Sequence, residues 1–136
     1  MNDCLFCKIV NNEIPSQKIF ENEKILAFLD INPINPGHVL IVPKKHCNGL
    51  LDAGEENLNA LIQPVPIIAK AIMSALDYEG FNLGVNNGSA AGQIVPHLHF
   101  HIMPRRAGDG HHLFHGAPYQ LGEIEKVAEK IRQQLT

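Results

Sequence analysis

Five short apolar runs, separated by turn residues, give the chain its basic pattern. They predict strands at 18–21, 24–29, 38–43, 81–87 and 96–103. Asn22 and Glu23 form a tight turn between the first two runs, and the breaker pair Pro36 and Gly37 precedes the third. A loop at 88–92, which contains two glycines, separates the last two.

The longest helical pattern covers residues 55–78, where apolar residues recur at a period close to 3.6. Pro64 and Pro66 lie inside this pattern. A proline in a helix interior costs about 3 kcal/mol or more, so we expect a break or kink near 63–66. The segment 122–135 predicts an amphipathic helix, and 5–11 a short helical turn. Strands joined by turns, with helices segregated from them, predict an α+β fold on an antiparallel sheet.

Composition indicates an ordinary globular chain. The 136 residues are 45% hydrophobic and 18% charged, and we expect a single domain over residues 1–136. The net charge is −3 with histidine neutral, which excludes a global basic field. We therefore expect neither nucleic acid nor a membrane as a partner, and any bound phosphate must be held by local donors.

The sequence also suggests a compartment. We expect no apolar run of the length of about 20 residues that spans a bilayer, and the first residues lack the pattern of a secretory signal. Three cysteines, two of them spaced as Cys4-x-x-Cys7, suit a reducing compartment better than a disulfide framework. We expect a cytoplasmic protein.

The segment 96–103 carries the most chemistry. In a strand, alternate side chains point to opposite faces, so His97, His99 and His101 share one face and the apolar residues between them share the core face. Three histidines at this period disfavour an ordinary half-exposed strand. A single ion bound by all three requires a sharp bend, because the outer α-carbons of a flat strand lie about 13 Å apart.

A flat strand favours a division of labour among the three imidazoles. The central residue is His99, and a neutral imidazole is a nucleophile. A neighbouring imidazole on the same face is placed to hydrogen-bond a reacting phosphate. The loop 86–93 adds amide and backbone donors, although ordinary turns have the same composition. The pattern indicates covalent phosphoryl or nucleotidyl transfer.

The run His97-Leu98-His99-Phe100-His101-Ile102-Met103 fits the signature His-φ-His-φ-His-φ-φ, where φ is apolar. On this run the chain resembles the histidine-triad (HIT) family, in the branch of the histidine-triad nucleotide-binding proteins and bacterial HIT hydrolases. The resemblance covers nearly the whole chain. Its other blocks, in order, are 4–9, 13–15, 26–31, 37–46, 85–88 and 91–93.

The resemblance implies a HIT-like fold with a five-stranded antiparallel sheet, and a homodimer whose sheets join. It also implies a site for a purine nucleotide, an AMP or GMP derivative. By position, His99 matches the nucleophile that forms a nucleotidyl-histidine intermediate. His101 matches the histidine that contacts the phosphate, and His38 the partner that supports the triad. These three are the candidate catalytic residues.

Further positions match the family's binding residues. Asp30 falls where an acid holds the ribose hydroxyls, and Ile31 falls at the base pocket. The positions that match the phosphate loop are Asn86, Gly92 and Gln93. One position departs from the family: Ile94 stands where a polar residue is frequent, so a hydrogen bond to the phosphate or leaving group is absent from the expected set.

Cys4 and Cys7 have the spacing of metal ligands, but two ligands do not close a tetrahedral site. A buried apolar pair is the alternative, and redox chemistry is disfavoured because no βαβ pattern surrounds the pair. Relatives that this chain resembles bind structural zinc through such a pair, a histidine matching His46 and the first triad histidine. The resemblance therefore implies a zinc site of Cys4, Cys7, His46 and His97, with no organic cofactor. For His111, His112 and His115, an adventitious metal site and a loop at the dimer or active-site rim both stay open.

Three functions remain in order of preference. The first is a hydrolase that attacks the α-phosphorus of purine nucleoside phosphoramidates, dinucleoside polyphosphates, or acyl or sulfo adenylates through His99. The second is a nucleotide-binding adaptor for signalling, which the intact set of histidines disfavours. The third is a nucleotidyl transferase acting on sugar phosphates, for which 136 residues leave little room.

Overall fold

The computed structural model describes residues 3–135. Its helices and strands, in chain order, are α1 (Leu5–Val10), β1 (Lys18–Glu21), β2 (Ile25–Leu29), β3 (Val39–Pro43), α2 (Glu55–Ile62), α3 (Val65–Leu76), β4 (Gly80–Val85), β5 (Phe100–Arg105) and α4 (Glu123–Leu135). Two short 3₁₀ turns, Leu50–Asp52 and Ser89–Ala91, lie in the connections.

The five strands form one antiparallel sheet in the order β1-β2-β3-β5-β4. This confirms the predicted α+β class and antiparallel sheet. In the register, Leu40 of β3 and Gly84 of β4 flank His101 of β5. His101 therefore lies on an inner strand, next to the strand that begins directly after His38.

The fifth strand differs from its predicted range. β5 begins at Phe100, whereas His97 lies in a bend before it. At this position a side chain takes the place of a strand-to-strand backbone hydrogen bond. The ring Nε2 of His97 donates to the carbonyl of Pro43, the last residue of β3 (2.9 Å). The alternation of faces survives the bend, because Leu98, Phe100 and Ile102 are all buried in the core, as expected.

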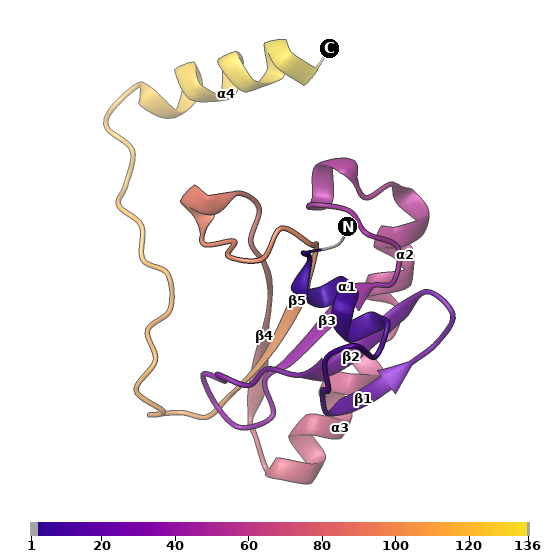
Figure 1. Ribbon diagram of the computed structural model, residues 1–136. Helices are drawn as coiled ribbons and strands as arrows, with labels where there is room; N and C mark the ends of the chain where they lie inside the picture. The colour runs from indigo at the N-terminus through magenta and orange to yellow at the C-terminus, as the bar shows by residue number, and fades with distance from the viewer. Residues whose placement is uncertain (1–2, 136) are drawn as a thin grey trace.

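The sheet has a hydrophobic layer on each face. On one face, Ile25, Ile41 and Ile102 pack with buried residues of α2 and α3. On the other, Leu26, Phe28, Leu40 and Val42 pack with Phe6 and Ile9 of α1. Figure 1 shows α1 and α3 on different sides of the sheet. The histidines of the triad segment lie on the α1 side.

The predicted break in the long helix is confirmed. α2 ends at Ile62 and α3 begins at Val65, with Pro64 as its N-cap and Pro66 in its first turn. A proline there removes no helical hydrogen bond, because the first turn has no intrahelical acceptor for its N–H.

We expected no apolar run long enough to span a bilayer. Judged by length and composition alone, this expectation was wrong. The stretch Glu55–Leu76, 22 residues of α2 and α3, is long and apolar enough to cross a membrane on those criteria alone. The core helix of a globular domain passes the same test, and Leu61, Val65, Ile68 and Ile72 are buried in the layer that covers the sheet. The stretch is apolar because it packs against that sheet.

After β5 the chain leaves the sheet. Residues 106–122, here called the strap, lead to α4, which stands apart from the sheet and its covering helices (Figure 1). The helix predicted at 122–135 is confirmed, but α4 has no buried residue. Ile124, Ile131 and Leu135, on its apolar side, are all more than half exposed.

Candidate functional site

The loop between β2 and β3, residues 30–38, brings Asp30 next to His38. The backbone N–H of Asp30 donates to the carbonyl of His38 (2.9 Å), which closes the loop at its base. Gly37 has a φ of 100°, and a Cβ there would lie 2.7 Å from Cδ1 of Leu76 in α3. The left-handed backbone conformation therefore favours glycine before His38, and a larger residue would also displace the end of the Leu76 side chain.

His38 and His101 form an imidazole pair with a defined proton arrangement. Nε2 of His38 lies 2.9 Å from Nδ1 of His101, and the backbone N–H of Ile34 donates to Nδ1 of His38 (3.2 Å). Because Nδ1 of His38 accepts, the neutral ring carries its proton on Nε2 and donates to His101. His101 then carries its own proton on Nε2, an atom that is buried without a hydrogen-bond partner among residues 3–135.

His99 has the complementary arrangement. Its Nδ1 lies 2.8 Å from the carbonyl of His97, and since a carbonyl only accepts, Nδ1 carries the proton. The neutral ring therefore keeps a lone pair on Nε2. The ring centroid lies 4.8 Å from that of His101 and 5.0 Å from that of Phe6. The bare nitrogen of His99 and the unpaired N–H of His101 thus belong to adjacent rings.

Burial keeps the imidazole pair uncharged. It lowers the pKa of His101 to about 4, and the neighbouring imidazoles of His99 and His38 act in the same direction. Burial also lowers the pKa of His38, against the opposing effect of Asp30, whose Oδ2 lies 3.7 Å from Nε2 of His38. At neutral pH the pair acts through hydrogen bonds rather than through a positive charge.

A cavity of about 440 Å³ opens beside these histidines. His99 and His101 line it, and so do four predicted binding residues: Asp30, Ile31, Asn86 and Gly92. Of these, Ile31 is 90% exposed at the rim, as is Ile94 at 91%. Among residues 3–135, the buried side-chain nitrogen and oxygen atoms without a hydrogen-bond partner are His101 Nε2 and Ser16 Oγ, and both residues line the cavity.

The apolar wall of the cavity was missed by the sequence analysis. It comes largely from α1 and the residues after it, and consists of Leu5, Phe6, Ile9 and Ile14 with Phe28 and Leu40 of the sheet. The apolar side of the 5–11 turn was the available signal, but nothing local places that turn over the histidines. The cavity therefore combines an apolar wall with a few polar groups, the usual composition of a small-molecule site.

A second cluster, the Cys/His cluster, lies behind the cavity and consists of Cys4, Cys7, His46 and His97. Its four ligand atoms all lie within 4.8 Å of one another. Nδ1 of His97 is 3.3 Å from Sγ of Cys4 and 3.6 Å from Sγ of Cys7. Nδ1 of His46 is 3.3 Å from Sγ of Cys7 and 3.1 Å from Nδ1 of His97.

The donor set of the Cys/His cluster fits a tetrahedral cation. Zn–S bonds of about 2.3 Å and Zn–N bonds of about 2.0–2.1 Å place neighbouring ligand atoms about 3.3–3.8 Å apart. The Nε2 atoms of His97 and His46 face the Pro43 carbonyl and the Asn48 side-chain oxygen, so both Nδ1 atoms are left as bare acceptors. Two facing lone pairs at 3.1 Å repel each other unless a cation lies between them.

The domain model named HIT domain matches residues 11–108. That range includes the β2–β3 loop, the triad segment and all five strands. The chain belongs to the HIT family. The resemblance and the HIT fold inferred from the sequence are thereby confirmed.

Curated HIT relatives cover nearly the whole chain. An uncharacterized HIT-like protein of Methanocaldococcus jannaschii is 42% identical over 129 residues, 95% of this chain and 98% of that protein. The adenosine 5'-monophosphoramidase HNT1 of Saccharomyces cerevisiae is 39% identical over 132 residues, 97% of this chain and 80% of the yeast protein. The adenylylsulfatase HINT3 of Arabidopsis thaliana is 45% identical over 108 residues, 79% of this chain and 55% of the plant protein.

Solved HIT structures share the fold. A protein of Streptococcus mutans UA159 matches with a TM-score of 0.93 at 39% identity, over 100% of this chain and 87% of that one. A zinc-bound histidine triad family protein of Mycobacterium smegmatis matches with a TM-score of 0.77 at 35% identity, over 98% of this chain and 95% of that one.

Gln93 lies apart from the other predicted binding residues of this HIT chain. Its Oε1 accepts from the N–H of Gly88 (2.9 Å), and its Nε2 donates to the carbonyls of Asn48 (2.7 Å) and Val95 (3.0 Å). Its backbone N–H donates to the carbonyl of Gly88 (3.1 Å). Gln93 does not line the cavity, and its donors are already engaged in holding the loop before the triad.

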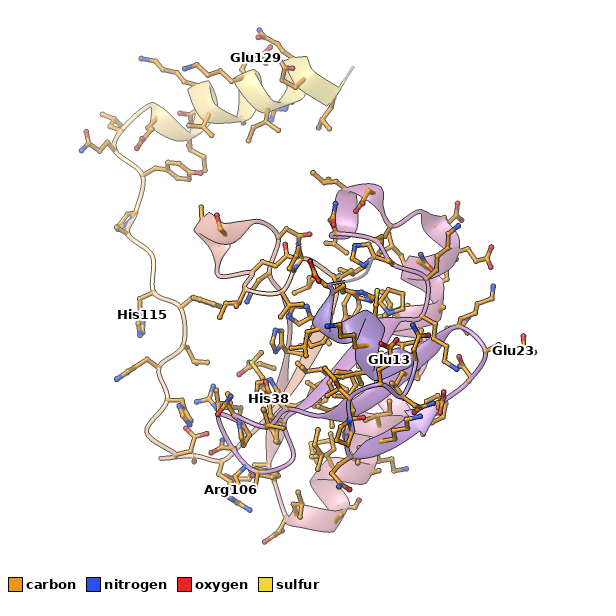
Figure 2. The ribbon with its side chains drawn as sticks, viewed as in Figure 1. Glu13, Glu23, His38, Arg106, His115 and Glu129 are labelled. Carbon is orange, nitrogen blue, oxygen red and sulfur yellow. The ribbon has the colours of Figure 1, made fainter. Side chains whose placement is uncertain are left out.

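The three histidines of the strap do not form a metal-binding group with one another. Within residues 3–135, the groups that could hold a metal ion are the Cys/His cluster and the set Asp30, His38 and His101. Neither contains His111, His112 or His115. His111 instead donates from Nε2 to the carbonyl of Ile34 (2.7 Å), and Figure 2 shows His115 farther along the strap, away from the sheet.

Proposed function

We propose that this HIT protein is a nucleotide hydrolase in which His99 attacks the α-phosphorus of a purine nucleoside monophosphate derivative. One observation carries the proposal: a bare imidazole nitrogen and an unpaired imidazole N–H belong to adjacent rings that line one cavity. A covalent phosphoryl transfer needs both, the first as nucleophile and the second as donor to the phosphate. Relatives named adenosine 5'-monophosphoramidase and adenylylsulfatase support this class of reaction.

The reaction proceeds in two displacements. In the first, the Nε2 lone pair of His99 forms a bond to phosphorus, and the bond from phosphorus to the leaving nitrogen or oxygen breaks. The leaving group departs with that electron pair and takes a proton from solvent. In the second, water attacks phosphorus, the bond to Nε2 breaks, the water's proton is lost to solvent, and the nucleoside monophosphate is released.

The imidazole pair supports both displacements. The Nε2–H of His101 donates to a non-bridging phosphate oxygen, where negative charge grows in the transition state. His38 donates to Nδ1 of His101 and so fixes the tautomer that presents this hydrogen. His38 therefore acts through His101 rather than on the phosphate.

The rest of the cavity binds the nucleotide. Asp30 accepts hydrogen bonds from the ribose hydroxyls, and Ile31 covers the base together with the apolar wall. Asn86 and Gly92 approach the phosphate. Gln93 serves this loop by bracing it, in keeping with its internal hydrogen bonds.

The Cys/His cluster is proposed to hold a structural zinc ion. Two thiolates and two imidazoles form a closed tetrahedral set, which leaves no position for substrate. When bound, zinc supplies cross-linking rather than reaction chemistry: it joins α1, the chain after β3 and the triad segment. The zinc-bound mycobacterial relative supports the assignment.

We also propose a homodimer in the cytoplasm, in which the sheets of the two copies join into one larger sheet. The strap and α4 expose large apolar side chains, including Phe114, Leu121, Ile124 and Ile131, and a second copy is the partner that covers them. No organic cofactor enters the proposal.

A turnover panel tests the hydrolase. The panel contains adenosine 5'-phosphoramidate, diadenosine polyphosphates and adenylyl sulfate, each with wild type and His99→Ala. We expect wild type to release AMP from at least one substrate and His99→Ala to release almost none. Release of no nucleotide from any of the three, or equal release by both proteins, contradicts the proposal.

A further inference from the structure

A polar cluster outside the cavity ties together the two segments that carry the imidazole pair. The side-chain amide of Asn35 donates to the carbonyl of Pro104 (2.9 Å) and to Oδ2 of Asp109 (3.0 Å). Asn35 lies three residues before His38, and Pro104 lies three residues after His101. One side chain therefore links the loop of one imidazole to the strand of the other.

Asp109 is held in place by a bidentate ion pair with Arg105. Its carboxylate accepts from Nε of Arg105 (2.7 Å) through Oδ2 and from Nη2 of Arg105 (2.9 Å) through Oδ1. The two side chains are 9% and 18% exposed, and the Arg105 guanidinium holds the pKa of Asp109 well below its usual range. Arg105 also donates to the side-chain oxygen of Asn82 in β4 (2.9 Å), so the pair is anchored on the sheet.

His111 extends the cluster to the residue that contacts His38. Its backbone N–H donates to Oδ1 of Asp109 (3.1 Å), and its ring Nε2 donates to the carbonyl of Ile34 (2.7 Å). The N–H of Ile34 is the donor that sets the tautomer of His38. The strap therefore reaches the imidazole pair through two neighbouring residues of the loop, Ile34 and Asn35.

We propose that Asn35, Asp109 and His111 are positioning residues that hold the loop so that Ile34 donates to His38. The inference rests on the proposed function only for its kinetic consequence. If the loop shifts, the Ile34 N–H leaves Nδ1 of His38, and the proton of that ring is free to move to Nδ1. His101 then loses its donor, and the hydrogen on its Nε2 is no longer fixed.

A side chain of the core supports the other end of the loop. The hydroxyl of Tyr78 donates to the carbonyl of Pro36 (2.6 Å), and the guanidinium of Arg106 stacks 4.0 Å from the Tyr78 ring centroid. Figure 2 shows Arg106 and His38 at the same end of the sheet. This contact holds the C-terminal half of the loop, whereas Asn35 and His111 hold the part next to Ile34.

The first test does not require turnover. Imidazole ¹⁵N NMR of wild type should show His38 protonated on Nε2, and Asn35→Ala should shift it to a mixture of tautomers. The matched control is Asn57→Ala, because the Asn57 amide also donates to a backbone carbonyl, that of Ala53 (3.1 Å), but on α2. His111→Ala, at an exposed position, serves if Asn35→Ala does not fold.

The second test is kinetic. Asn35→Ala and His111→Ala should lower kcat at least about tenfold with KM changed by less than about twofold, since misplacement affects the reacting geometry. His111→Gln keeps a side-chain N–H donor and should recover most of the rate. A lowered Tm with wild-type tautomers in both alanine variants would overturn the proposal. A wild type without turnover would refute the hydrolase, and the NMR result would still decide this inference.

Discussion

His38 donates to His101 through a hydrogen bond of 2.9 Å that joins a loop to an inner strand of the sheet. His38 and the Nε2 atom of His101 are buried, so the proton arrangement of the pair depends on neighbouring protein groups such as the backbone N–H of Ile34 rather than on solvent.

The first prediction concerns His99. Replacing it with alanine should lower kcat by at least about a thousandfold, because the covalent route is lost. Acid-quenched wild type should carry a nucleotidyl adduct on His99 by mass spectrometry. His112→Ala, at an exposed histidine of the strap, should retain full activity and the adduct. An adduct on a residue other than His99 would sink the assignment.

The second prediction concerns ribose. A carboxylate that accepts from two hydroxyls makes charge-assisted hydrogen bonds worth about 1.5–3 kcal/mol each. Asp30→Ala should therefore raise KM for ribonucleotide substrates by about tenfold or more, and much less for the 2'-deoxy compounds. Steady-state kinetics with both sugars makes the comparison. Equal losses for the two sugars would remove Asp30 from ribose recognition.

The third prediction concerns metal. Protein purified without added metal should contain close to one zinc per chain by elemental analysis. Cys4→Ser and Cys7→Ser should lose the zinc and lower Tm by at least about 5 °C. Cys47→Ser, which changes the buried third cysteine, should keep the zinc. Zinc-free wild type with a Tm unaffected by chelator would mean that the cysteines only pack.

The fourth prediction concerns pH. The pKa of His101 falls to about 4 on folding, and that of His38 also falls. Between about pH 6.5 and pH 4 the unfolded chain therefore binds more protons, and stability must decrease as the pH is lowered through this window. His101→Asn should show a shallower decrease of Tm than wild type or His112→Ala. Parallel curves for all three proteins would contradict the shifted pKa.

The fifth prediction concerns the exposed side of α4. Ile124→Glu with Ile131→Glu should convert a dimer into a monomer, because both apolar side chains are exposed on a helix that has no buried residue. Lys130→Glu, on the same helix, is the charge-change control. Light scattering coupled to size exclusion measures the mass. A monomeric wild type would refute the dimer, and a dimer that survives the double change would place its interface elsewhere.

The fold was predictable where the signal was local. Alternating and helical periods located the sheet and the helices, and Pro64 and Pro66 located the break between α2 and α3. The bend at His97 was not predictable, because it depends on the Pro43 carbonyl, which only the folded sheet brings within 2.9 Å. The apolar side of α4 was predicted, but its exposure in the single chain was not.

The site shows the same division between residue types and their contacts. The sequence identified the histidines. The structure places His99 and His101 on one cavity, with His38 hydrogen-bonded to His101, while His97 turns to the cysteines. The wall formed by α1 was missed, because a six-residue helix carries too little pattern to indicate what it covers. The internal contacts of Gln93 depend on Asn48, which lies 45 residues away in the chain.

Phe6 occupies a place where two otherwise separate constraints meet. It lies between Cys4 and Cys7 in the chain, and its ring stacks edge-on against both His97 and His99. If homologous proteins lack the two cysteines, other contacts must therefore hold Phe6 in the apolar wall of the cavity. An engineer who enlarges that cavity at position 6 would in turn disturb the two cysteines. We therefore expect that substitutions at Phe6 which change the substrate range also change the binding of metal at the Cys/His cluster.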